Sequence, residues 1–452
     1  MKKILSFTFA FILSNVIIAQ INPKKCITTD IVKEELQHNS EYRVKIEALA
    51  NFYQNHTNIN HKSPSTITIP VVVHIIHRNS HSNIGTGTNI SDAQIADQLR
   101  ILNEDYSKTN PEFPNPPRNT FVNYAGNPEI QFCLASIDPN GNLTTGITRT
   151  SSSKTSWDAD DDDEKNYMKL TSQGGKNNWD PLRYLNIWVC NLTNSSGGGQ
   201  TLGYAYLPGL QNGNQSWKDG LVVDYQQFGT IGTANLSDGR TPTHEIGHYL
   251  GLSHTFCENT DSQGNPICCD NDQNPFLGVD DTPASKDIYY GSVNATTNNN
   301  TCNDISYQNI FTTNVLDMDE NYMSYAATTW MFSDEQVNVM QTVLNASTSL
   351  GGRKMLWQNS PVTVDCITST QNNPSKKIQL HIFPNPTKGD VYFDASQKIT
   401  TISINNIIGE EVLSNIPIKN NQINISMLKN GIYFVHIYSD ERAITKKIIL
   451  TK

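Results

Sequence analysis

The most informative segment of this 452-residue chain lies near its middle and reads His244-Glu245-Ile246-Gly247-His248-Tyr249-Leu250-Gly251-Leu252-Ser253-His254. On a helix, His244 and His248 stand four residues apart and face the same side. Gly251 can adopt the unusual backbone angle that turns the chain back. We therefore predict that His254 reaches the same point from outside the helix.

Three histidines and a glutamate in this spacing are typical of a catalytic zinc site. Three neutral imidazoles leave one corner of a tetrahedron open for water. Glu245 can reach that water, take its proton and deliver it to a leaving amine. The competing interpretation is a helix with surface histidines. Adding Gly251 and His254 to the pattern makes a chance match about four hundred-fold rarer, which disfavours that interpretation. The segment predicts a zinc-dependent endopeptidase.

The composition is that of an acidic, globular chain. Hydrophobic residues make up 37%, enough for a sizeable core, and the formal net charge is -10. Affinity for nucleic acids comes from Lys and Arg on phosphates, so we expect no nucleic-acid partner. Protein or peptide substrates remain compatible with this charge.

The first twenty residues (1–20) resemble an export signal. Lys2 and Lys3 precede an apolar run from Ile4 to Ala19, and Ala19-Gln20 is the expected cleavage region. The alternative is an uncleaved membrane anchor, which the short run disfavours. We predict a pro-segment at 21–62, helical over Ile31–Gln54.

The next part alternates strand and helix signals, an α/β or α+β pattern. A β-branched run predicts a strand at 69–76, and Ser91 is placed to cap a helix through Leu102. Further strands are expected at 130–135, 184–190, 203–205 and 220–225, and the helix of the histidine segment begins near Thr241-Pro242. The acidic run 158–164 is read as a solvated loop, with a cation site as the alternative. This catalytic domain is predicted at 63–355, followed by a polar linker at 356–375.

Beyond residue 376 the pattern changes to short alternating strands separated by turn signals, such as Phe383-Pro384-Asn385-Pro386 and Lys429-Asn430-Gly431. Strands are expected at 432–437 and 444–450. This pattern predicts a small β-sandwich over 376–452.

Four of the eight cysteines crowd into 257–302, directly after the histidine segment. An exported protein allows disulfides, and vicinal Cys268 and Cys269 are poorly placed to bridge each other. Two pairings remain, namely Cys257 with Cys268 and Cys269 with Cys302, or Cys257 with Cys269 and Cys268 with Cys302. Two more cysteines lie in strand-like runs and are either paired or buried thiols: Cys133 and Cys190.

The histidine segment resembles that of the metzincin metallopeptidases, and Asn321-Tyr322-Met323-Ser324-Tyr325 resembles their Met-turn. Thr255-Phe256 and Asp281-Thr282-Pro283 are similar to the pappalysin family, which includes ulilysin-like enzymes. The resemblance implies one catalytic zinc, Met323 as an apolar floor beneath it and Tyr325 as an oxyanion donor. It implies an α/β (α+β) domain with a twisted mixed sheet and a zinc helix. We expect this domain to be a monomer in which an extended peptide adds to the sheet edge.

The same resemblance suggests structural calcium in the loop between His254 and the Met-turn. That loop offers Asp280, Asp281 and Thr282, together with Asp270 and Asp272, all hard oxygen donors. Related enzymes are kept latent by a pro-segment residue on the zinc, and Cys26 fits such a switch. The alternative for Cys26 is a disulfide with a core cysteine.

Arginine-preferring relatives carry acidic residues after the Met-turn, where this chain has Ala326-Ala327-Thr328-Thr329, so the cleavage preference stays open.

The C-terminal part resembles the sorting domain of the type IX secretion system, through Phe383–Gly389, Gly431–Phe434 and Lys446–Leu450. That implies export through the periplasm of a Gram-negative bacterium to the surface or the medium, with the secretion machinery as a partner. Two alternatives to a pappalysin-like zinc endopeptidase stay open. One is a catalytically inactive surface or adhesion protein with a structural zinc, and the other is a peptidase of another metzincin family.

Overall fold

The structure is a computed structural model that describes residues 24–56, 66–196, 199–269, 278–307, 309–358, 380–395, 399–406, 411–414, 416, 422–439 and 443–452. The chain divides into two compact units, Met1–Ser369 and Thr370–Lys452. The expected export signal and most of the expected linker lie outside the described residues. Within the described parts, no helix is both long and apolar enough to cross a membrane.

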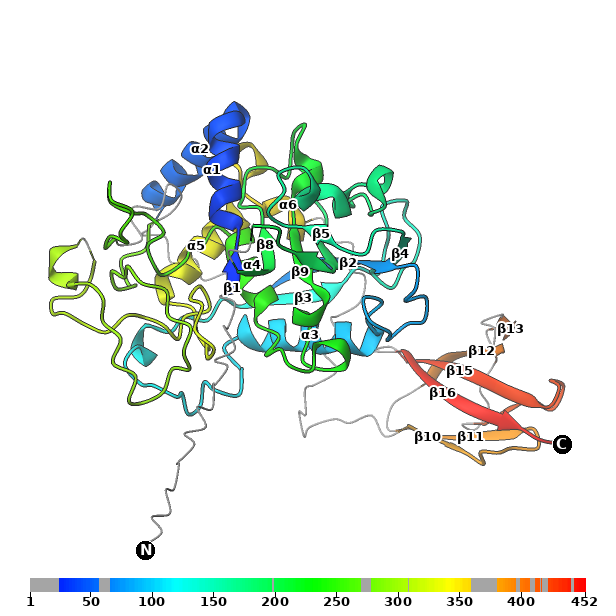
Figure 1. The fold of residues 1–452 in the computed structure, drawn as a ribbon. Helices are drawn as coiled ribbons and strands as arrows, with labels where there is room; N and C mark the ends of the chain where they lie inside the picture. The colour runs from blue at the N-terminus through cyan, green and yellow to red at the C-terminus, as the bar shows by residue number, and fades with distance from the viewer. Residues whose placement is uncertain are drawn as a thin grey trace, which may run out of the picture. The chain divides into compact units, whose positions relative to one another are not determined.

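A mixed, mostly parallel sheet forms the centre of the first unit (Figure 1). Its strand order is β1 (Lys24–Cys26), β8 (Gln200–Ala205), β9 (Leu221–Asp224), β6 (Leu185–Cys190), β2 (Ile67–Arg78) and β3 (Ile130–Leu134), and β4 (Ile147–Ser152) also pairs with β2. The pairing of β8 with β9 is antiparallel, whereas β1, β3, β4, β6 and β9 each pair in parallel. The expected twisted mixed sheet is therefore confirmed. A short second ladder joins β5 (Trp157–Asp158) to β7 (Leu192–Thr193).

Strand β2 is long and central because its sequence suits burial on both faces. Eight of its 12 residues are β-branched, and every position from Ile69 to His77 is buried. Parallel strands covered on both faces carry such runs rather than an alternating pattern. The strand expected at 69–76 is thus present and extends further at both ends.

Two helices lie together against this sheet and position the histidine segment. Helix α3 (Asp92–Asp105) is capped by the Ser91 side chain, which accepts a hydrogen bond of 3.1 Å from Gln94 N, as predicted. Helix α4 (Thr241–Tyr249) carries Pro242 in its first turn and packs against α3, β8 and β9. Helix α5 (Asp334–Asn345) starts with a capping box of Ser333 and Gln336, and α6 (Lys354–Gln358) follows it.

The predicted pro-segment folds as strand β1 and two helices, α1 (Thr28–His38) and α2 (Ser40–His56), drawn in blue in Figure 1. The single helical run expected at 31–54 is therefore two helices that meet at Asn39. Ile31, Tyr42 and Ile46 are nearly fully buried and belong to the main core. Two ion pairs from α1 add to this docking, Glu34 with Lys165 and Glu35 with Lys218.

The second unit consists of two antiparallel sheets around one core, the arrangement expected of a small β-sandwich. One sheet has the order β10 (Leu380–Phe383), β11 (Asp390–Ala395), β14 (Gln422–Asn424). The other has the order β13 (Glu411–Leu413), β12 (Ile399–Asn406), β15 (Gly431–Ser439), β16 (Ala443–Leu450). Their inward side chains include Val391, Ile404, Val435 and Ile448, all fully buried.

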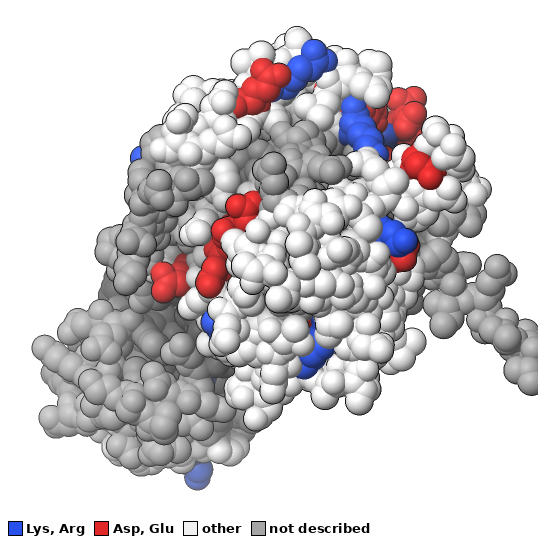
Figure 2. Space-filling view, turned by 90° about the vertical axis from the view of Figure 1, so that its left-hand side faces the viewer, with Lys and Arg blue, Asp and Glu red and all other residues white. Residues whose placement is uncertain are grey.

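Charged side chains are sparse on the face that Figure 2 shows. Among the described residues in that view, Lys and Arg stand apart from one another, while several acidic side chains gather beside a grey region. Most of this surface carries uncharged residues, in keeping with a charged fraction of 17% in the sequence.

Candidate active site

Helix α4 and the turn after it bring the three histidines together. The helix ends at Tyr249, and Gly251 follows with a φ of 98°. That left-handed conformation strains any residue with a Cβ, so glycine is needed here. The turn that the sequence predicts is present, and it directs His254 back towards the helix. All three histidines are less than 9% exposed.

The three rings converge through their Nε2 atoms, which lie 3.1 and 3.2 Å from one another. Nδ1 of His244 lies 2.7 Å from the carbonyl oxygen of Tyr322, and Nδ1 of His248 lies 2.7 Å from that of Leu252. A carbonyl only accepts hydrogen bonds, so Nδ1 carries the proton in both rings and Nε2 presents a lone pair. Lone pairs facing each other at this distance repel unless a cation lies among them. The donor set therefore fits zinc.

The protonation of these rings suits metal binding. Burial, followed by the proximity of His254, lowers the pKa of His244 to about 3 and that of His248 well below its ordinary value. Neutral imidazole is the form that ligates a metal. Among the described residues, Cys26 and the three histidines form a cluster whose four ligand atoms all lie within 4.8 Å of one another.

Glu245 lies beside this cluster, 1% exposed. Burial raises its pKa to about 8, against opposing hydrogen bonds from Cys26 and Thr28. A Cβ on Gly203 of β8 would lie 3.0 Å from Glu245 Cγ and 3.1 Å from its Oε1. Gly203 thus leaves the space that the carboxylate occupies, a requirement that the sequence analysis did not foresee.

Cys26 reaches the cluster from the pro-segment, although it lies more than two hundred residues from the histidines in sequence. It is a buried free thiol, so the alternative of a disulfide with a core cysteine is wrong. Its Sγ lies 3.5 Å from Glu245 Oε2 and 3.2 Å from Thr28 Oγ1. Strand β1 holds it there by pairing in parallel with β8, where Cys26 stands opposite Gly203.

Tyr325 and Met323 complete the surroundings of the histidines. The Tyr325 hydroxyl accepts a hydrogen bond of 2.8 Å from the backbone N–H of Cys26, and its ring centroid lies 5.0 Å from that of His254. Met323 is fully buried, and a Cβ on Gly247 would lie 2.4 Å from its Sδ. Met323 therefore packs directly against α4.

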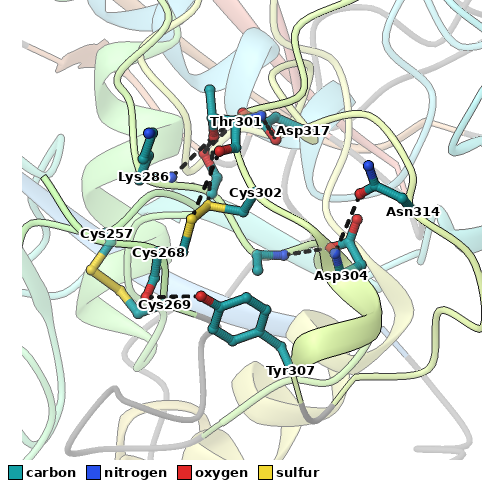
Figure 3. Close-up of a disulfide and its surroundings, with 12 residues drawn as sticks. Cys257, Cys268, Cys269, Lys286, Thr301, Cys302, Asp304, Tyr307, Asn314 and Asp317 are labelled. Carbon is teal, nitrogen blue, oxygen red and sulfur yellow. Dashed lines mark hydrogen bonds between the residues drawn. A yellow bond between two sulfur atoms is a disulfide. The ribbon is translucent and has the colours of Figure 1, made fainter.

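The cysteines after the histidine segment adopt the second of the two predicted pairings (Figure 3). Cys257 bonds to Cys269 and Cys268 bonds to Cys302, with Cα–Cα distances of 5.5 and 5.9 Å. Around them, Asp317 accepts hydrogen bonds from the N–H and hydroxyl of Thr301, at 3.1 and 2.7 Å. Elsewhere Cys133 is disulfide-bonded and Cys190 is a buried free thiol.

The residues considered for calcium lie between this loop and α5. The Asp281 carboxylate accepts hydrogen bonds from the Ser333 hydroxyl at 2.6 Å and from Glu335 N at 2.8 Å. Burial raises its pKa to about 7 despite these bonds. Asp280 N donates to the Glu335 carboxylate, and Thr282 is fully buried. The expected donors Asp270 and Asp272 lie outside the described residues.

A pocket opens beside Glu245 and Tyr325. It is lined further by Leu202, Asp238, Arg240, Thr241, Ser324, Ala326 and Thr329. Arg240 is neutralised by Glu112, to which its Nη2 donates at 2.7 Å, and by Asp105 at 3.5 Å. The segment after the Met-turn contributes only uncharged residues, in line with the open cleavage preference.

One residue of this region was missed by the sequence analysis. Oε2 of Glu258 lies 3.1 Å from Nδ1 of His254. The position of Glu258 four residues after His254 could have indicated this contact. A carboxylate commonly faces the ring nitrogen of a metal-binding histidine that does not bind the metal.

Two family models match the chain. A model described as pregnancy-associated plasma protein-A matches residues 170–345, and one described as a secretion system C-terminal sorting domain matches residues 381–451. The first covers the histidine segment and the Met-turn, and the second covers nearly all of the second unit.

Solved structures and curated relatives agree with the first model. The chain is 36% identical to mature mirolysin of Tannerella forsythia in complex with a cleaved peptide, with a TM-score of 0.52, covering 65% of this chain and 96% of the other. For a promirolysin mutant from the same organism the identity is 32% and the TM-score 0.54, covering 74% and 97%. An extracellular metalloprotease of Pyricularia oryzae is 28% identical over 222 residues, 49% of this chain and 58% of that relative.

Proposed function

The chain belongs to the pappalysin family of metzincin metallopeptidases, and we propose that it is a secreted zinc endopeptidase acting on protein or peptide substrates. The observation that carries the proposal is the convergence of the Nε2 atoms of His244, His248 and His254 at 3.1 and 3.2 Å beside the Glu245 carboxylate. We assign the three histidines as zinc ligands. A zinc ion so bound supplies a water of lowered pKa and polarises the scissile carbonyl.

The remaining chemistry belongs to two side chains. Glu245 takes the proton of the attacking water and returns it to the leaving amine. The Tyr325 hydroxyl, which contacts the pro-segment backbone in this structure, donates a hydrogen bond to the developing oxyanion once a substrate replaces that segment. The substrate adds along β8, whose edge β1 occupies here.

The structure supports latency through the pro-segment. Cys26 Sγ lies among the histidine nitrogens, so we assign it as the ligand that fills the open zinc position before activation. Burial raises the pKa of this thiol well above its ordinary value, so a cation must hold it as a thiolate. The share of this chain covered rises from 65% for mature mirolysin to 74% for promirolysin, which supports removal of a segment of this kind.

We propose the following processing and metal content. Residues 1–20 are a signal peptide, 21–62 the pro-segment, 63–355 the catalytic domain, 356–375 a linker and 376–452 the sorting domain. The sorting domain engages the secretion machinery and delivers the protein, as a monomer, to the surface or medium of a Gram-negative bacterium. Asp280, Asp281 and Thr282 contribute to a structural calcium site. Calcium should then raise the thermal midpoint of the wild type more than that of Asp281→Asn, and equal shifts would remove this assignment.

The alternative of an inactive surface protein with a structural zinc has less support. Glu245 and Tyr325 are both present and both face the histidines, and a closed structural site would not leave a position for a removable cysteine. No observation on the described residues favours the inactive alternative.

The central test is hydrolysis of casein by activated enzyme. Glu245→Gln is expected to lower kcat by roughly 10²- to 10⁴-fold while zinc stays bound, because only the proton transfer is lost. Glu104→Gln, which changes a carboxylate on α3 away from the site, serves as the matched control and should keep full activity. Wild-type turnover by Glu245→Gln, or activity that persists after a chelator has removed the metal, would contradict the proposal.

A further inference from the structure

The three proposed zinc ligands are not held in the same way. His244 and His248 direct Nδ1 at backbone carbonyl oxygens, those of Tyr322 and Leu252. His254 instead directs Nδ1 at the side-chain carboxylate of Glu258, whose Oε2 lies 3.1 Å away. A carboxylate is charged and a carbonyl is not, so this contact makes the third imidazole the most electron-rich of the three.

Glu258 is well fixed for such a role. Its neighbour Cys257 is buried and bonded to Cys269, and Cys257 N donates to the Ser285 carbonyl at 2.9 Å. Phe256 stacks on the His254 ring with centroids 4.7 Å apart and an angle of 10°. The backbone directly before the carboxylate is therefore held by a disulfide, a hydrogen bond and a ring contact.

The pro-segment uses the same oxygen. The Thr29 hydroxyl donates a hydrogen bond to Glu258 Oε2, the atom that faces His254. Thr29 lies three residues after Cys26, so the pro-segment contacts the histidine cluster directly through Cys26 and indirectly through Glu258. The Glu258 side chain is about 30% exposed, which leaves it accessible when the pro-segment departs.

We propose that Glu258 is a positioning residue that orients His254 for zinc, and that Thr29 fastens the pro-segment to this same carboxylate. The proposal rests on the proposed function, because it assumes that His254 binds zinc. Glu258 keeps the His254 proton on Nδ1, which leaves the Nε2 lone pair for the metal. Thr29 adds a second anchor to latency besides the thiol.

Zinc affinity of the full-length chain tests the first part, by competition with a chromophoric chelator. Glu258→Ala is expected to weaken zinc binding by roughly 10- to 100-fold, and Glu258→Gln by less, because its amide oxygen can still face Nδ1. In cobalt-substituted protein both variants should shift the visible absorption bands of the metal. Wild-type zinc affinity together with an unchanged cobalt spectrum in Glu258→Ala would overturn the assignment.

A matched control separates positioning from damage to the loop. Asp261 lies three residues further on, is partly exposed, and accepts hydrogen bonds from the N–H groups of Gln263 and Asn265. Asp261→Asn should keep wild-type zinc affinity, and an equal loss there would refute a specific role for Glu258. His254→Ala distinguishes the two levels of inference, since zinc binding unaffected by that change would refute the proposed function itself.

Latency tests the second part. Thr29→Val removes the hydroxyl and keeps the shape, so activity of the secreted chain should appear roughly tenfold faster, and Thr29→Ser should restore the wild-type rate. Zinc content should be the same in all three proteins. An activation rate unchanged in Thr29→Val would show that Thr29 does not anchor the pro-segment.

Discussion

Arg353 forms a buried ion pair with Asp219 beside the helix that carries the histidines, and this pair is expected to stabilise the first unit. Its guanidinium donates two hydrogen bonds to Asp219, at 2.9 and 2.8 Å, and its Nε donates to the Tyr249 carbonyl at 2.9 Å. Both side chains of this ion pair are only 1% exposed, and the guanidinium lies 3.4 Å from the Tyr249 ring centroid. Tyr249 is the last residue of α4, so the pair connects residue 353 directly to the helix of the histidines.

Asp219→Ala would leave the Arg353 charge buried without its anionic partner. Breaking a buried pair in this way costs about 3–5 kcal/mol, a large part of the roughly 5–15 kcal/mol that stabilises a typical domain. Replacing both partners by apolar residues, Asp219→Leu with Arg353→Met, strands no charge and is nearly neutral in comparable cases. The double variant should therefore be more stable than Asp219→Ala, by roughly 3 kcal/mol.

Urea unfolding followed by tryptophan fluorescence measures this difference. All six tryptophans lie at or before residue 357, so the signal reports on the first unit alone. The reasoning is refuted if Asp219→Ala unfolds within about 1 kcal/mol of the wild type, or if the double variant is the less stable of the two. A chain ending at residue 352 should share the defect of Asp219→Ala, whereas a chain ending at 358 should not.

Three further predictions concern the site and the core. Tyr325→Phe removes one oxyanion donor and should lower kcat by roughly 10²- to 10³-fold with KM nearly unchanged; steady-state kinetics that show the loss in KM alone would contradict its role. Cys26→Ala should raise the activity of the uncleaved precursor by roughly tenfold or more, since each 1.4 kcal/mol of lost pro-segment binding is a factor of ten; a precursor that stays fully latent argues against the switch. Burial lowers the pKa of His74 from 6.5 to about 4, so between these values the unfolded chain binds a proton that the folded chain does not. The free energy of unfolding should then fall by about 3 kcal/mol as the pH drops from 6.5 to 4. Urea titrations at the two pH values should show a smaller loss of stability for His74→Gln than for the wild type, and an equal loss would contradict this prediction.

Local patterns predicted the features that depend on neighbouring residues. The strand at β2, the cap at Ser91 and the first turn of α4 follow from β-branching, a side-chain acceptor and a proline, and each acts within a few residues. The helical run of the pro-segment was predicted as one element, although Asn39 offers a local signal for the break: its Oδ1 accepts a hydrogen bond of 3.0 Å from Tyr42 N at the start of α2.

The cysteines show where local reasoning stops. Sequence spacing left two pairings open, because a disulfide depends on Cα distances near 5.5 Å that only the folded loop establishes. The contact of Glu258 with Thr29 could not be predicted either, since it joins the histidine loop to a segment more than two hundred residues earlier in the chain.

The histidine segment by itself determined that three imidazoles and a glutamate gather at one point, because helical periodicity and one glycine turn act within eleven residues. Only the tertiary structure decided what surrounds that point: Gly203 making room for Glu245, Met323 packed beneath Gly247, Cys26 seated among the nitrogens and Glu258 behind the third ring. The contact of Cys26 with Glu245 joins residues 219 positions apart, and such pairings arise from the sheet order and core packing of the whole unit rather than from any local pattern.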